Sequence, residues 1–337
     1  MAIHHLGYRE WDQPRTGHWL RPKYIALSGI ALVWRRKWLR LMLMLAWLPI
    51  AVPAFGIFAF ESSLNEPGFL RVVANLIAGP LQRPDIAFMV LADPESARHE
   101  VWTLLIMAFF RYPQLSAMIL LVGLIAPMLI SYDLRSRAYL LYFSRPLRII
   151  DYILGKAAVV WFFLGMIVTV PALSLYVVGV LLSPNLSVVQ ETWDIPLRIL
   201  GASFVLLVPT TALAICYSAC TSESRYASFA WFATWILGSV AYQVMTFSDV
   251  DFGPDRRPRP NLSQPAAMAQ PSLESGALDL DRWRILSPYH ALGKVQAWVF
   301  GLDPTEGSVL PTLLLLSGIT VFGFWIVRRR LISLLSV

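Results

Sequence analysis

Residues 157–190 read AAVVWFFLGMIVTVPALSLYVVGVLLSPNLSVVQ, without a single Asp, Glu, Lys or Arg. A helix that crosses the hydrocarbon core of a membrane needs about 20 mostly apolar residues. This stretch is therefore long enough for one tilted span and an additional outer turn. It predicts a transmembrane helix rather than an element of a soluble core.

The same pattern recurs on both sides of this stretch. A charge at the bilayer centre costs about 2.5–3.5 kcal/mol on insertion scales, so six long charge-free windows are hard to reconcile with a soluble core. We expect an all-α integral membrane protein, with residues 1–40 as a cytoplasmic segment and residues 41–337 as a six-helix transmembrane domain. The predicted spans are about 41–60, 112–132, 157–183, 199–220, 226–247 and 308–327.

Composition agrees with this class. Hydrophobic residues make up 57% of the 337 residues and charged residues 15%, against roughly 45–50% and about 25% in globular domains. This balance excludes a disordered chain and disfavours a soluble enzyme. The first window begins too late and is too long for a signal-peptide core, so we expect it to remain as an anchor. Prolines inside the windows predict kinks, because membrane helices tolerate them; they are Pro49, Pro53, Pro127, Pro171 and Pro209.

The distribution of charge predicts the orientation. If both termini are cytoplasmic, the inner segments hold 17 of the 28 Lys and Arg but only 5 of the 21 Asp and Glu. The positive-inside rule favours this arrangement, in a bacterial cytoplasmic membrane. The net charge of +7 is thus a topology signal that suits contact with membrane lipid. It does not indicate nucleic acid, because the basic residues flank the spans and form no separate basic domain.

The segments between the spans have patterns of their own. Aromatic, aliphatic and basic residues mix over residues 19–37, which predicts a helix lying in the cytoplasmic interface; the alternative is the start of a long first helix. The outer segments are 61–111 and 249–306. In the first, an apolar run near residues 101–110 predicts an interfacial or re-entrant helix ending near Pro113. In the second, a Pro-rich loop at 252–275 precedes an amphipathic helix at 283–300.

The inner segment after the second span reads SYDLRSRAYLLYFSRP at 131–146 and DYILGK at 151–156. It resembles the permease subunits of type-2 ATP-binding-cassette (ABC) exporters, in which an acidic, arginine-bearing exit from the second span leads to a Ser-Arg-Pro turn and a Tyr-x-x-Gly-Lys entry to the third. The resemblance implies that residues 133–156 couple the spans to an ATPase. The candidate coupling residues are Asp133, Arg135, Arg137, Tyr139, Ser144, Arg145, Pro146, Tyr152, Gly155 and Lys156. The long first outer segment and the Pro-rich loop depart from the family pattern.

The residues themselves support a docking segment. Five basic residues, four tyrosine or phenylalanine rings and a proline-fixed turn offer charge, rigid contact area and a preorganised backbone. The alternative is that the basic residues only anchor the spans by the positive-inside rule. Composition alone favours that alternative, whereas the order of residues in the motif favours docking.

Motifs that are missing restrict the function further. The P-loop pattern of Gly, four residues and Gly-Lys-Ser/Thr does not occur, so we expect the chain to bind no cofactor and ATP with magnesium to lie on a separate ATPase. The resemblance implies two ATPase subunits and a second permease chain, identical or related. The His-Glu-x-x-His motif of zinc proteases does not occur either, so the sequence gives no indication of that class of enzyme. Spans without charge suit an apolar or amphiphilic cargo. A membrane scaffold and an ion-coupled secondary transporter are the alternatives, although the latter usually needs acidic or histidine residues inside its spans.

Overall fold

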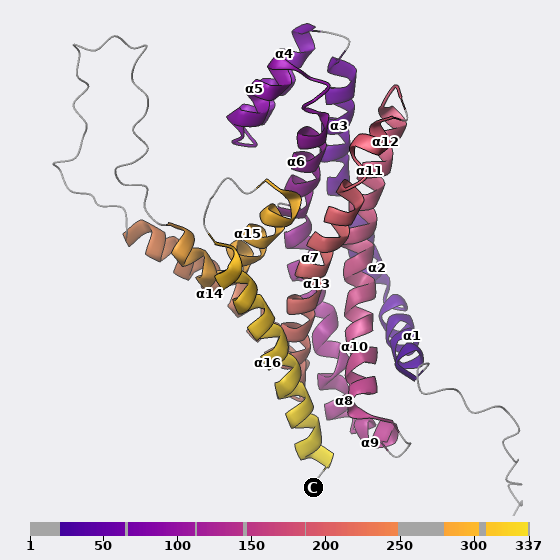
Figure 1. Cartoon of the computed structure of the whole chain (residues 1–337). Helices are drawn as coiled ribbons and strands as arrows, with labels where there is room; N and C mark the ends of the chain where they lie inside the picture. The colour runs from indigo at the N-terminus through magenta and orange to yellow at the C-terminus, as the bar shows by residue number, and fades with distance from the viewer. Residues whose placement is uncertain are drawn as a thin grey trace, which may run out of the picture.

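The computed structural model describes residues 21–64, 67–111, 113–143, 147–185, 187–248, 280–302 and 308–335. Every regular element within these ranges is a helix (Figure 1). The elements are α1 Arg21–Trp34, α2 Lys37–Leu45, η2 Leu48–Ile50, α3 Ala51–Ser63, α4 Pro67–Ala78, α5 Pro84–Ala92, α6 Arg98–Arg111, α7 Pro113–Leu129, α8 Ser131–Arg135, α9 Ala138–Phe143, α10 Ile149–Leu164, η3 Gly165–Thr169, α11 Val170–Leu182, α12 Val188–Glu191, α13 Ile195–Cys220, α14 Ser224–Ser248, η4 Leu280–Leu286, α15 Pro288–Phe300 and α16 Leu310–Leu335. The predicted Pro-rich loop at 252–275 lies outside the described residues.

Five stretches of this helical structure are long and apolar enough to cross a membrane, which confirms an all-α protein of the integral membrane type. They are Lys37–Ser63, Arg98–Arg135, Ile149–Leu182, Ile195–Cys220 and Leu310–Leu335. The predicted fifth span at 226–247 corresponds to α14, which is long enough but is not among the five. Its Ser, Thr, Gln and Tyr residues make it less apolar than the others.

The candidate span that contains the predicted second window also includes part of the predicted first outer segment. The helix expected to be interfacial or re-entrant is α6, and the apolar stretch Arg98–Arg135 runs from it through α7 to α8. Proline at the first position of a helix is tolerated, because its missing N–H would have no helical partner there; Pro113 accordingly begins α7. Pro113 therefore does not end the apolar stretch, and the candidate span starts well before Tyr112.

Prolines mark irregular turns in two other spans. Pro49 lies in the 3₁₀ turn η2, between α2 and α3. Pro171 is the second residue of α11, which follows the π-helical turn η3. A proline removes one helical hydrogen bond and its ring crowds the carbonyl four residues earlier. The predicted kinks at these two positions thus have local structural counterparts.

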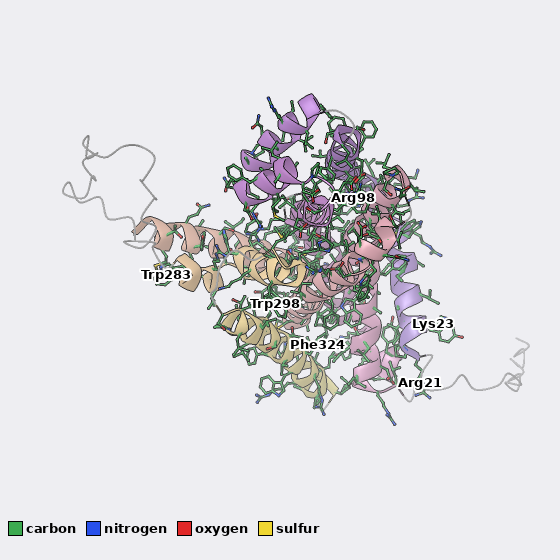
Figure 2. The ribbon with its side chains drawn as sticks, turned by 45° about the horizontal axis from the view of Figure 1, so that its top comes forward. Arg21, Lys23, Arg98, Trp283, Trp298 and Phe324 are labelled. Atoms are coloured by element: carbon green, nitrogen blue, oxygen red, sulfur yellow. The ribbon has the colours of Figure 1, made fainter. Side chains whose placement is uncertain are left out.

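Helix α1 is a separate element that packs against α10. It ends at Trp34, and α2 begins at Lys37, so the alternative of one long first helix is wrong. Glycine permits the close approach, because a Cβ on Gly155 would lie 2.7 Å from Ile25 Cβ. Figure 2 shows Arg21 and Lys23 on α1 at one edge of the molecule and Trp283 on η4 at the opposite edge.

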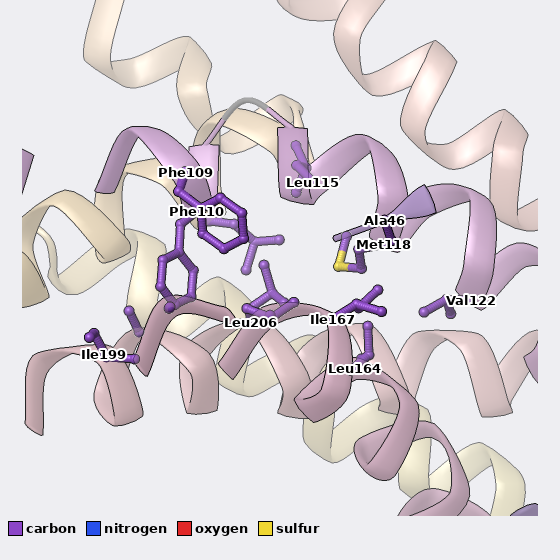
Figure 3. Packing of buried hydrophobic residues seen from close by; sticks show 14 of the residues in the cluster. Ala46, Phe109, Phe110, Leu115, Met118, Val122, Leu164, Ile167, Ile199 and Leu206 are labelled. Atoms are coloured by element: carbon purple, nitrogen blue, oxygen red, sulfur yellow. The ribbon is translucent and has the colours of Figure 1, made fainter. Parts of the chain in front are cut away.

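The core of the bundle surrounds α13, which contacts α7, α10, α15 and α16. Large apolar side chains from α6, α7, α10, η3 and α13 interlock (Figure 3); they include Phe109, Phe110, Met118, Leu164, Ile167, Ile199 and Leu206. The α13–α16 crossing is tight, because a Cβ on Gly323 would lie 3.0 Å from the carbonyl oxygen of Ala212. This packing holds the two ends of the bundle, where the polar residues gather, in fixed relative positions.

Candidate functional site

Helices α8 and α9 connect two spans at the end of the bundle where the chain also ends (Figure 1). The start of α8 is fixed to α13 by Ser218, whose Oγ accepts hydrogen bonds from the N–H groups of Ile130 (3.1 Å) and Ser131 (3.0 Å). The hydroxyl of Ser131 donates to the carbonyl of Ser218 at 2.7 Å. Helix starts leave backbone N–H groups without helical partners. Ser218 satisfies two such groups and so locks α8 against the fourth candidate span.

A buried ionic cluster ties α8 to α10. Lys156 Nζ lies 2.7 Å from Asp133 Oδ2, with side-chain exposures of only 7% and 11%. The Tyr152 hydroxyl donates to the same carboxylate oxygen at 2.7 Å. Removing one member of a buried ion pair typically costs 3–5 kcal/mol, because the other charge stays buried without compensation. The cluster of Asp133, Tyr152 and Lys156 therefore makes the junction of these two spans rigid.

Helix α9 rests on this cluster through aromatic contacts. The ring centroids of Tyr142 and Phe143 lie 5.5 Å and 5.6 Å from that of Tyr152. The Lys156 ammonium is 5.7 Å from the centroid of Tyr142. Burial, together with the negative charge of Asp133, raises the pKa of the Tyr142 hydroxyl, so this residue stays neutral. The aromatic face of α9 is thus held inward, and its opposite face is presented outward.

The outward surface of α8 and α9 is basic and apolar. Arg135 and Arg137 are exposed, and Leu141 is 75% exposed. Arg135 makes a long contact of 3.5 Å with Glu223. Arg137 has a φ of 55°, which is uncommon for a residue other than glycine and turns the chain sharply between the two helices. A short helix with this surface is suited to contact a soluble partner.

The structure divides the predicted coupling residues into distinct groups. Asp133, Tyr152 and Lys156 lie together inside the protein, and Gly155 faces α1. Arg135 and Arg137 are on the surface, while Tyr139 is half-buried and lines a cavity of about 310 Å³ with Cys220 and Arg330. Ser144, Arg145 and Pro146 lie outside the described residues. Among the described residues, the buried group therefore positions the segment, and the exposed Arg135 and Arg137 can contact a partner directly.

Sequence reasoning missed the residues that hold the segment from other helices. Ser218 on α13 is one, and Ile25 on α1 is another. Neither belongs to a recognisable motif, because both act through contacts across the fold. The pairing of Asp133 with Lys156 did have a signal, since the two opposite charges flank consecutive antiparallel spans at the same end.

Ionisable groups also gather at the opposite end of the bundle. Arg98 Nε and Trp102 Nε1 both donate to Oε1 of the buried Glu61 at 3.1 Å. Glu61 and Arg98 lie outside the predicted charge-free windows, but inside two of the longer candidate spans. The Glu61–Arg98 ion pair joins α3 to α6, so its first effect is to hold these two helices together.

A second polar group lies beside it. Asp194 accepts from His99 Nε2 at 2.9 Å and pairs with Arg198 at 2.7 Å. Burial alone would raise the pKa of Asp194, but the hydrogen bond and charge of His99 and the charge of Arg198 hold it below its usual range. Arg198 also donates to the carbonyl of Phe300, so this carboxylate connects α6, α13 and α15.

The described residues contain no group of three or more His, Cys, Asp or Glu placed to hold a metal ion. Cys216 and Cys220 are free thiols. A scan against protein-family models finds no match for this chain, and a search of curated proteins finds none either. The arguments for function therefore rest on the residues and their geometry.

Proposed function

We propose that this chain is the permease subunit of an ABC exporter. In this proposal α14 also crosses the membrane, as the fifth of six spans, both termini face the cytoplasm of a bacterial cell, and α8 and α9 receive the movement of a separate ATPase. The observation that carries the proposal is the exposed α9, held by the Asp133–Lys156 ion pair (2.7 Å) between two candidate spans. A rigid attachment of α8 and α9 to the spans is needed if movement of an ATPase is to be transmitted to the spans.

The contacts favour transmission of force to several spans at once. Displacement of α9 presses Tyr142 and Phe143 on Tyr152 of α10. Displacement of α8 pulls on Ser218 of α13 through three short hydrogen bonds. Packed interiors transmit displacement because they compress little. An ATPase that pushes on this surface would therefore tilt α7, α10 and α13 together.

The surface also indicates the character of the partner. Arg135, Arg137 and Arg148 are exposed, and exposed Leu140 and Leu141 lie beside them on α9. An acidic groove with an apolar floor would complement such a helix. The proposal places ATP and magnesium on two such ATPase subunits, adds a second permease chain, and assigns an apolar or amphiphilic cargo.

Charge reversal tests the proposal. Arg137→Glu, and separately Arg145→Glu and Pro146→Ala, should weaken recovery of an ABC-class ATPase and lower its stimulated turnover. Arg71→Glu is the matched control, because Arg71 is exposed on α4, in the predicted outer segment. All variants should insert normally, since none changes the apolar helices. Full ATPase recovery and turnover in every α8–α9 variant would refute the coupling function and favour a membrane scaffold.

One observation favours an ion-coupled secondary transporter as a second candidate. Glu61 Oε2 is buried and has no hydrogen-bond partner among the described residues. Buried acidic groups in spans often bind protons or sodium. If Glu61 couples an ion, Glu61→Gln should abolish transport driven by a proton or sodium gradient in vesicles without ATP. If ATP drives transport, that variant should retain ATP dependence.

A further inference from the structure

A cavity of about 220 Å³ lies among α6, α14, η4 and α15, away from the coupling segment. Its charged lining residues, among those described, are all basic: Arg111 at the end of α6, Arg284 on η4 and Lys294 on α15. Lys294 is only 6% exposed. Three cations from three elements concentrate positive potential in one small volume.

The fold keeps Arg111 in place on this cavity. Its Nη1 donates to the carbonyl of Tyr289 at 2.6 Å, and its guanidinium lies 3.9 Å from the centroid of the Tyr289 ring. Gly293 provides the space, because a Cβ there would lie 1.6 Å from Arg111 Nη1. Any larger residue at position 293 would therefore displace the Arg111 side chain from this position.

His290 adds a neutral hydrogen-bonding group to the same wall. Burial lowers the pKa of its imidazole to about 4, and the charges of Arg111 and Arg284 act in the same direction. The ring stacks on Tyr242 at a centroid distance of 3.7 Å. Its Nδ1 is buried without a hydrogen-bond partner among the described residues. In the tautomer protonated at Nδ1, this atom can donate to an oxygen of a ligand.

The rest of the lining is apolar, which narrows the class of ligand. It comprises Leu81, Leu104, Met107, Ala108 and Ala297. The volume is smaller than the roughly 300–1,000 Å³ of pockets that enclose a whole drug-sized ligand. Such a cavity suits a compact polar head group attached to an apolar chain. Guanidinium and ammonium groups together are typical of phosphate recognition.

We propose that this cavity binds the phosphate group of an amphiphilic molecule, with Arg111, Arg284 and Lys294 on its oxygens and His290 as a neutral donor. The identification of this ligand as cargo rests on the proposed exporter function, whereas the binding site itself does not. No local sequence motif marks the site, because Arg111 lies far from Arg284 and Lys294 in the sequence.

Binding to the purified full chain in maltoside detergent, without ATPase, tests the proposal. The probes are dodecyl phosphate, dodecanol and inorganic phosphate. We expect dodecyl phosphate to bind most tightly. Lys294→Gln and Arg284→Gln should each weaken it by about 10- to 100-fold, the usual effect of removing a charged hydrogen bond. Gly293→Ala should weaken it by displacing Arg111. Arg284→Lys keeps the charge and should retain most of the affinity.

Arg71→Gln is the charge-matched control and should bind as the unmodified protein does, because Arg71 is exposed on α4. Unchanged affinity in Lys294→Gln and Arg284→Gln, with circular dichroism showing intact helices, would overturn the site. Equal affinity for inorganic phosphate would overturn the assignment to an amphiphile, and equal affinity for dodecanol would overturn the role of the anionic group. Because no ATPase is present, failure here is distinct from failure to recover an ATPase.

Discussion

Replacement of Lys156 by Met removes one partner of the buried ion pair and nearly preserves the length of the side chain. At 2.7 Å, two unit charges attract by about 6 kcal/mol at an effective dielectric constant of about 20. Burial of both charges offsets much of that attraction, so the intact pair contributes little net stability. The single variant is different, because Asp133 then remains buried without a cation and keeps, among the described residues, the hydrogen bond from the Tyr152 hydroxyl.

We expect Lys156→Met to lower the free energy of unfolding by about 3–5 kcal/mol. The double variant Asp133→Asn with Lys156→Met should recover most of that loss, because no uncompensated charge remains. Titration with sodium dodecyl sulfate in mixed micelles, followed by tryptophan fluorescence, measures both values. The ion-pair reasoning fails if Lys156→Met costs less than about 1 kcal/mol, the range of exposed pairs, or if the two substitutions are additive.

The other predictions concern packing, exposure, pH and topology. Gly155→Ala should destabilise the docking of α1 by about 1–3 kcal/mol, because its Cβ would meet α1 at 2.7 Å, whereas Gly318→Ala has open space and should not; thermal unfolding compares them. Arg135→Ala should change stability by less than about 1 kcal/mol, since its pair with Glu223 is long and exposed, yet reduce ATPase recovery in pull-down assays. Asp194 has a lowered pKa, so its stabilisation is present above the unfolded value near 3.8 and is lost as pH falls through the lower folded value; acid unfolding curves should show less pH dependence in Asp194→Asn. A single cysteine at position 260 should label from outside intact cells and one at position 140 should not; the reverse pattern would overturn the topology.

The charge-free windows predicted the helical membrane fold because the free energy of inserting a helix into a membrane depends mainly on the residues of that helix itself. Five of the six windows overlap candidate spans. The window that became α14 contains Ser, Thr, Gln and Tyr residues, and hydropathy alone does not place it among them. The sequence analysis did not extend the second window back to Arg98, because Arg111 and Pro113 are both ordinary signals for the end of a span. Tertiary contact of Arg111 with Tyr289 explains why the charge is tolerated there.

The candidate site was predictable only in part. A motif located the segment, but it did not separate Asp133 and Lys156, which are buried, from Arg135 and Arg137, which are exposed. Burial depends on which helix covers a residue. Here α1 and α13 lie far from the coupling segment in the sequence, and α9 is too short to be recognised from a sequence pattern. The cation-lined cavity has no sequence signal at all, because Arg111 and Lys294 meet only after α6 and α15 pack together.

The described ion pairs lie toward the two ends of the bundle and not midway along the spans. At one end Asp133 and Lys156 join α8 to α10, and at the other Glu61 and Arg98 join α3 to α6. Between these two ends the helices pack through a large cluster of buried apolar side chains. Because packed apolar interiors transmit displacement, we expect any coupling between the ends to proceed by movement of whole helices, with α13 at the centre of the bundle. This is why fixing α8 to Ser218 of α13 matters for any model in which an ATPase drives the opposite end.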